Sequence, residues 1–148
     1  MYDHWEFPGR GSLMLTVGLH ADNEKKALLD NFCIAYKYIL GKHKLIATQA
    51  TGEHIRNAAG LEVSELLSGR LGGDKQLETA IMNDEIDILI TFEHVSLETV
   101  HELSDHNSLV RLCDFYNIPV ATNIATAECL IMSLDRGDLN WRIEMKNT

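Results

Sequence analysis

Short apolar runs alternate along this chain with longer segments in which apolar residues recur at helical spacing. The apolar runs predict strands at 13–19, 44–48, 61–67, 86–92 and 118–122. The periodic segments predict helices at 24–40, 53–59, 75–83, 107–116 and 125–132. Near the end, Trp141, Ile143 and Met145 alternate with polar neighbours, which predicts an edge strand over 139–145.

The order of these elements predicts the fold class. Strands that alternate with helices form a sheet of parallel strands with helices on both faces. We therefore expect a single three-layer α/β/α domain with a mainly parallel central sheet, spanning 13–148 and preceded by a flexible leader at 1–12. Such sheets bind ligands at the carboxyl ends of their strands, where polar segments occur at 20–22, 48–52, 92–94 and 122–123.

Composition excludes several classes of function. The chain has 148 residues, 45% of them hydrophobic, which suffices for one domain with a core. Its net charge of −9 argues against nucleic-acid binding. No apolar run approaches the roughly 20 residues that span a bilayer, and the leader does not resemble a secretory signal. We therefore expect a cytoplasmic protein with neither nucleic acid nor membrane as a partner.

Cysteine and histidine usage predicts no metal site. Cys33, Cys113 and Cys129 are far apart and form no Cys-x-x-Cys pair, so we expect reduced, buried cysteines. No cluster of histidines and acids shows the spacing of metal ligands. His43 and His54 are expected at the surface.

The segment at 67–74, Leu-Ser-Gly-Arg-Leu-Gly-Gly-Asp, carries the most specific chemistry. Glycine allows backbone N–H groups to approach an anion closely, and the Ser68 hydroxyl adds a donor. Asp74 follows directly, so a carboxylate lies beside a candidate phosphate site. This arrangement suits proton abstraction from a small phosphorylated substrate, although a structural loop with a surface aspartate is the commoner meaning of such a segment taken alone.

From about residue 15 to residue 131 the chain resembles the methylglyoxal synthase family. The resemblance rests on segments that occur in the same order: His20 with Asp22 and Lys25, 47–52, 67–76, 86–90 and 117–127, the last reading Asn-Ile-Pro-Val-Ala-Thr-Asn-Ile-Ala-Thr-Ala. It implies a lyase that removes a proton from dihydroxyacetone phosphate, forms an enediolate and eliminates inorganic phosphate to give methylglyoxal. It also implies that no metal or organic cofactor is needed, and that the chain forms a homo-oligomer, usually a hexamer.

The resemblance assigns catalytic roles to three residues. Asp74 corresponds to the catalytic base, and His101 to a histidine that polarises the substrate oxygens or relays a proton. The segment between 92 and 111 contains one extra residue relative to the family, so Glu102 is the alternative to His101 at that position. Asp105 corresponds to a second acid, or it caps the following helix.

The resemblance also assigns the binding positions. Those that match the phosphate site are Lys25, Thr48, Thr51, Ser68 and the Gly69 backbone. His20 and Asp22 match a His-Asp pair that lines the site, with Ala21 inserted between them. Without the resemblance, Lys25 reads as a solvated helix residue, and the serine and threonines read as turn residues.

Two departures from the family pattern keep other functions open. Gln49-Ala50-Thr51-Gly52 stands where the family has Gly-Thr-Thr-Gly, and Glu93-His94-Val95 stands where it has Trp-Asp-Pro. One hydroxyl donor and one site aspartate are thereby lost. The alternatives are a non-catalytic regulatory module that binds a small anion on the same fold, or a related lyase or isomerase for another small sugar phosphate.

Overall fold

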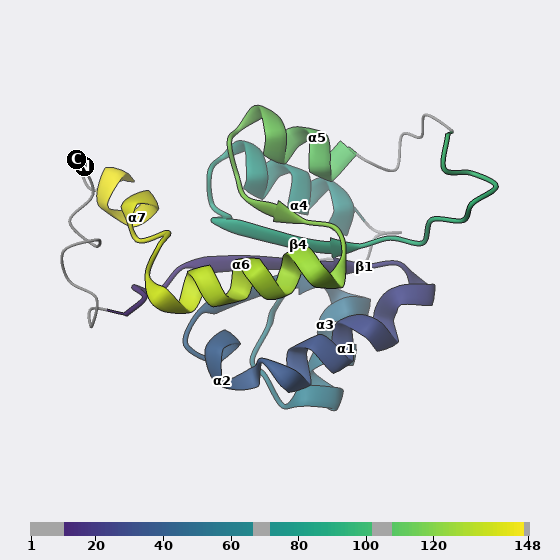
Figure 1. Ribbon diagram of the computed structural model, residues 1–148, viewed down its shortest axis with the longest axis horizontal. Coiled ribbons are helices and arrows are strands. Elements are labelled where there is room, and N and C mark those ends of the chain that lie inside the picture. Colours follow the sequence, from purple (N-terminus) through teal and green to yellow (C-terminus); the bar gives the residue numbers. More distant parts are fainter. Residues whose placement is uncertain (1–10, 67–71, 102–107, 147–148) are drawn as a thin grey trace.

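The computed structural model describes residues 11–66, 72–101 and 108–146 (Figure 1). The strands are β1 (Thr16–Ala21), β2 (Lys44–Thr48), β3 (Ser64–Leu66), β4 (Ile88–Phe92) and β5 (Val120–Ala121). The helices are the short 3-10 helix η2 (Asn23–Lys25), α1 (Lys26–Ala35), α2 (Lys37–Leu40), α3 (Gln49–Ala59), α4 (Gly73–Met82), α5 (Ser108–Phe115), α6 (Ile124–Arg136) and α7 (Trp141–Lys146).

The five strands form one sheet in the order β3-β2-β1-β4-β5, and every neighbouring pair is parallel. The chain therefore builds outward from β1 through β2 to β3, then crosses to the other side of β1 to add β4 and β5. The predicted parallel sheet is confirmed. All five strands point their carboxyl ends toward one edge, here called the carboxyl edge.

Alternating side chains of the strands create the two helical layers. Ile88, Ile90 and Phe92 of β4 pack on the face covered by α1, α3 and α6, whereas Leu89 packs on the face covered by α4 and α5. Figure 1 shows α4 and α5 on one side of the sheet and α1 and α3 on the other. The predicted three-layer α/β/α arrangement is confirmed.

Two predicted helices differ in extent. The predicted helix at 24–40 is interrupted at Tyr36, whose backbone dihedrals lie outside the helical region, so α1 and α2 are separate. Helix α3 begins at Gln49, directly after β2, instead of at residue 53. The segment 49–52 is therefore the first turn of a helix and not a loop.

The predicted edge strand over 139–145 is wrong, because residues 141–146 form helix α7. The backbone N–H of Ile143 donates to the Asn140 carbonyl at 3.1 Å, as in a helical turn. Arg142, one of the polar residues in the alternating pattern, is the buried residue of α7. The alternation of apolar residues thus did not mark the buried side.

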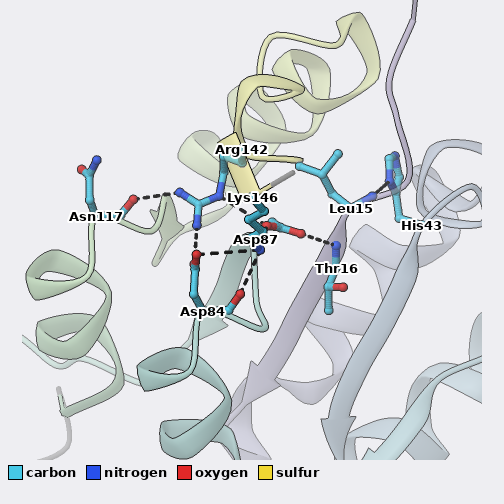
Figure 2. A network of polar contacts seen from close by, with 8 residues as sticks. All are labelled: Leu15, Thr16, His43, Asp84, Asp87, Asn117, Arg142 and Lys146. Carbon is cyan, nitrogen blue, oxygen red and sulfur yellow. Dashed lines mark hydrogen bonds and ion pairs between the residues drawn. The ribbon is translucent and has the colours of Figure 1, made fainter. Parts of the chain in front are cut away.

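A buried ionic network holds α7 against the opposite edge of the sheet (Figure 2). Asp87 is 2% exposed, and its carboxylate accepts from the Thr16 N–H at 2.8 Å and from Lys146 Nζ at 2.9 Å. Arg142 lies 3.4 Å from Asp87 and donates to Asp84 at 2.9 Å. The network therefore joins β1, the start of β4 and α7.

His43, expected at the surface, is only 7% exposed. Its Nδ1 accepts a hydrogen bond from the Leu15 N–H at 3.0 Å, so the proton of the neutral ring resides on Nε2 (Figure 2). Within the described residues Nε2 is buried without a hydrogen-bond partner. Protonating Nδ1 would place two N–H groups against each other and break the bond to Leu15.

Acidification is expected to destabilise the protein through His43. Burial lowers the pKa of His43 below its ordinary value of 6.5. As pH falls from the ordinary pKa of 6.5 through the lowered pKa of the folded state, the unfolded chain binds more protons than the folded chain. The free energy of unfolding therefore falls with pH over this window. His43→Asn keeps an acceptor for Leu15 and removes the titration.

Urea unfolding at about pH 7.5 and about pH 5.5 tests this expectation. The wild type should lose more stability between the two pH values than His43→Asn does. The variant retains every other titrating group, so the difference isolates His43. Equal losses in the two proteins would contradict the assignment.

Two of the three cysteines follow the expectation. Cys33 and Cys113 are buried, and burial raises the pKa of each thiol to about 12. Cys129 is exposed on α6, contrary to the expectation. All three are free thiols.

Candidate active site

The segments that follow β1, β2 and β4 leave the sheet at the carboxyl edge, and His20 of β1 lies beside Asp74 at the start of α4. Helix α4 begins after Gly72, whose φ of 100° lies in the left-handed region that glycine adopts without strain. Asp74 is thereby placed in the first turn of α4, and its side chain is 59% exposed. The predicted base is accessible at the predicted edge of the sheet.

His20, near the end of β1, lies beside Asp74. The His20 Nε2 atom is 3.9 Å from the Asp74 Oδ1 atom, and the Nδ1 atom is 3.1 Å from the Thr91 hydroxyl oxygen on β4. Burial lowers the pKa of His20, against the opposing effects of Asp74 and Asp22. The imidazole is therefore neutral near pH 7, with one donor and one acceptor nitrogen.

Asp22 joins the segments that follow β1 and β4. Its carboxylate accepts from the His94 N–H at 3.0 Å, and its own N–H donates to the Phe92 carbonyl at 3.0 Å. The His94 ring lies 3.0 Å from Glu24. Asp22 therefore positions the backbone after β4, a role that the sequence analysis did not assign to it.

Thr48 and Thr51 flank the start of α3. Thr48 ends β2 and Thr51 lies in the first turn of the helix, and their hydroxyl oxygens are 3.5 Å apart. Both residues are buried. A side chain at Gly52 would collide with Glu65 on β3, so the helix approaches the neighbouring strand closely at this glycine.

The two adjacent lysines differ in their surroundings. Lys26 Nζ donates to the Ala21 carbonyl at 2.8 Å, and burial lowers the pKa of Lys26 against the nearby charges of Asp22 and Asp74. Lys25 is half-buried; its backbone N–H donates to the Asp22 carbonyl at 2.9 Å, but its side chain forms no hydrogen bond or ion pair within the described residues. Lys25 is therefore the one whose ammonium group is available to an anion.

The remaining predicted site residues are His101, Ser68, Gly69 and Asp105. His101 is exposed at the end of the segment after β4, which extends away from the sheet in Figure 1, and it forms no hydrogen bond or ion pair with another described residue. Ser68, Gly69 and Asp105 lie outside the described residues, as does Glu102. Their assignments stay predictions.

Several known proteins are similar in sequence to most of this chain. The model of the MGS-like domain matches residues 31–122. The methylglyoxal synthase of Caldicellulosiruptor saccharolyticus is 52% identical over 128 residues, which are 86% of this chain and 90% of that protein. The methylglyoxal synthase of Alkaliphilus metalliredigens is 45% identical over 132 residues, covering 89% of this chain and 98% of the relative.

The chain belongs to the methylglyoxal synthase family. A solved structure agrees with this assignment: the crystal structure of methylglyoxal synthase from Elizabethkingia anophelis NUHP1 matches with a TM-score of 0.74 and 36% identity, over 85% of this chain and 84% of that one. The resemblance inferred from the sequence is confirmed, and the protein is an enzyme of a family of lyases.

One departure from the family pattern, Glu93-His94-Val95 after β4, replaces an aspartate by His94. In this chain the His94 ring lies beside the Glu24 carboxylate, and the backbone N–H of His94 donates to Asp22. The sequence analysis missed Glu24, and it also missed Thr91, the partner of His20. The only sequence signal for Thr91 is a hydroxyl inside the apolar run at 86–92.

The described residues contain neither a candidate metal-binding cluster nor a candidate membrane span. In 11–66, 72–101 and 108–146, no group of three or more histidines, cysteines and acids lies close enough together to hold a metal ion. Over the same ranges, no helix has the length and apolar character needed to cross a bilayer.

Proposed function

We propose that this protein converts dihydroxyacetone phosphate to methylglyoxal and inorganic phosphate. One observation carries the proposal beyond family membership: an accessible carboxylate, Asp74, lies beside a neutral histidine, His20, at the carboxyl edge of a parallel sheet. A base next to a neutral N–H donor suits removal of a proton from a carbon beside a carbonyl group.

In the proposed reaction Asp74 takes a proton from the hydroxymethyl carbon. The electron pair of that C–H bond forms the double bond of an enediolate, whose negative charge develops on the former carbonyl oxygen. The terminal hydroxyl then loses its proton and its oxygen forms the aldehyde C=O, the double bond shifts toward the phosphate-bearing carbon, and phosphate leaves with the electron pair of the broken carbon–oxygen bond. The remaining enolate accepts a proton on the former phosphate-bearing carbon and becomes methylglyoxal. Of the two protons released from the substrate, one is returned to carbon and one leaves with phosphate, so the reaction needs no oxidant or reductant.

The phosphate group is proposed to bind across α3 and the segment before α4. The hydroxyls of Thr48 and Thr51 and the first turn of α3 supply directional donors, and Lys25 supplies a charge. Ser68 and the Gly69 backbone complete the site in this proposal. The positions of Thr48 and Thr51 at the carboxyl edge support it.

His101 and Asp105 are proposed to act from the segment after β4. His101 would polarise or relay a proton between the substrate oxygens, and Asp105 would assist. Because His101 is exposed and its side chain forms no hydrogen bond or ion pair with another described site residue, this role requires the segment to approach the bound substrate. Location in the cytoplasm and assembly into a homo-oligomer, a hexamer by family resemblance, also stay proposals.

The two lysines provide a test of the phosphate site. Lys25→Ala is expected to raise the dissociation constant of inorganic phosphate by about ten- to a hundredfold, because a charge-assisted hydrogen bond is lost. Lys26→Ala, which removes the same charge one residue away, should have a smaller effect, since Lys26 is bound to Ala21. Isothermal titration calorimetry measures both; an equal or larger effect of Lys26→Ala would contradict the assignment.

A panel of substrates tests the proposed function itself. Purified protein is given dihydroxyacetone phosphate, glyceraldehyde 3-phosphate and larger ketose and aldose phosphates, and the aldehyde and phosphate products are measured. The proposal predicts methylglyoxal from dihydroxyacetone phosphate at the highest kcat/KM. Preference for another sugar phosphate would favour a related lyase or isomerase, and phosphate binding without turnover on any substrate would favour a regulatory module.

A further inference from the structure

Thr91 is a polar residue inside a strand that is otherwise apolar. The sequence of β4 is Ile-Leu-Ile-Thr-Phe, and all five residues are buried. Thr91 is 1% exposed. A buried hydroxyl without a hydrogen bond is destabilising, and valine has almost the same shape. The hydroxyl at this position therefore needs a partner inside the protein.

That partner is the imidazole of His20. The parallel register of β1 and β4 pairs His20 with Thr91, and their side chains share the face of the sheet that α4 covers. The Thr91 hydroxyl oxygen lies 3.1 Å from the His20 Nδ1 atom. No other hydrogen bond of the Thr91 side chain is found within the described residues.

The surroundings of the other ring nitrogen decide the direction of this hydrogen bond. His20 Nε2 faces the Asp74 carboxylate at 3.9 Å. A lone pair on Nε2 would be repelled by the carboxylate, whereas an N–H would be attracted. The proton of the neutral ring is therefore on Nε2, and Nδ1 accepts a hydrogen bond from the Thr91 O–H.

We propose that Thr91 is a positioning residue that holds His20 as an Nε2–H donor directed at the reacting oxygen of the substrate, an inference that rests on the proposed function. The 3.9 Å separation from Asp74 exceeds hydrogen-bond length, so the Nε2–H is available to a ligand. A donor fixed beside the base stabilises the negative charge that develops on the former carbonyl oxygen. The opposite tautomer would present a lone pair to that oxygen.

The charged groups around His20 agree with a neutral ring. Asp74 on α4 and Asp22 after β1 favour protonation, whereas Lys26 on α1 opposes it. Burial outweighs the two carboxylates and lowers the pKa of His20. A neutral ring has two tautomers: the Asp74 carboxylate favours the proton on Nε2, and the Thr91 O–H stabilises the same tautomer by donating to the lone pair on Nδ1.

The test compares Thr91→Val, which removes the hydroxyl, with Thr91→Ser, which keeps it. The control is Thr16→Val, the same change in the same sheet at the edge remote from the site. Nitrogen-15 NMR of protein labelled in its histidine rings reports the tautomer of His20, whose signals are identified as those missing in His20→Gln. Steady-state kinetics with dihydroxyacetone phosphate report kcat and KM separately.

We expect the wild type to carry the His20 proton on Nε2. In Thr91→Val the Nδ1–H tautomer should appear and kcat should fall about tenfold, as for the loss of one hydrogen bond, with KM almost unchanged. Thr91→Ser should restore both readouts, and Thr16→Val should change neither. A structural role for the hydroxyl alone would alter stability without moving the tautomer.

Three results would overturn the inference. One is a wild-type His20 with its proton on Nδ1, which requires no variant to fold. Another is a Thr91→Val protein with the wild-type tautomer and kcat, and the third is a Thr91→Ser protein as impaired as Thr91→Val. Because the NMR readout needs no turnover, it stays informative if dihydroxyacetone phosphate is not the substrate, so failure of the two proposals can be told apart.

Discussion

Asp74→Asn is expected to lower kcat by roughly 10²–10⁴-fold, the usual contribution of a general base. The carboxamide has the size of the carboxylate but cannot accept the proton from carbon. The Asp74 side chain is exposed and forms no hydrogen bond within the described residues, so the fold should be unaffected. Methylglyoxal production from dihydroxyacetone phosphate measures the loss.

The control for this prediction is binding of inorganic phosphate, which should survive in Asp74→Asn because the proposed phosphate site uses other residues. Asp114→Asn makes the same change at an exposed position on α5 and should leave turnover intact. Wild-type turnover in Asp74→Asn would eliminate Asp74 as the base. Loss of phosphate binding together with turnover would place Asp74 in the binding site instead.

Asp87→Ala should have the largest effect on stability, about 3–5 kcal/mol, which is typical when one partner of a buried ion pair is removed. The Arg142 side chain is only 5% exposed and would keep its charge beside an empty position. The Thr16 N–H and Lys146 would also lose an acceptor. Urea unfolding measures the change in the free energy of unfolding.

Asp84→Ala provides the comparison, because it removes another carboxylate that binds Arg142. The Asp84 side chain is 51% exposed, so its loss should cost below about 1 kcal/mol. Asp87→Asn, which retains an acceptor for Thr16, should fall between the two. Equal stability of Asp87→Ala and Asp84→Ala would show that the buried network does not hold α7 and the sheet together.

The fold was predictable because its signals are local. The apolar run at 86–92 reflects a strand that is buried on both faces of the sheet. The periodic segment at 24–40 reflects a helical face that packs on the core. Helix α7 was not predictable, since its buried residue is an arginine whose carboxylate partners lie 55 and 58 positions away in the sequence. Such a partnership leaves no periodic pattern within a segment as short as 139–145.

The candidate site was predictable in part for the same reason. The polar segments after the strands indicated the carboxyl edge, and the glycines before Asp74 indicated the proposed base, which lies in the first turn of α4. The link between Thr91 and His20 depends on the register of two strands, and threonine is common in strands, so its presence in β4 carried no separate signal. The distinction between Lys25 and Lys26 likewise depends on how η2 turns after β1.

The time course of product release from dihydroxyacetone phosphate tests the central claim most directly. Purified wild-type protein is mixed with the substrate, and methylglyoxal and inorganic phosphate are measured in the same samples. The proposed lyase predicts that both accumulate together in equal amounts. Phosphate release without methylglyoxal, or phosphate binding with no product of either kind, would contradict it.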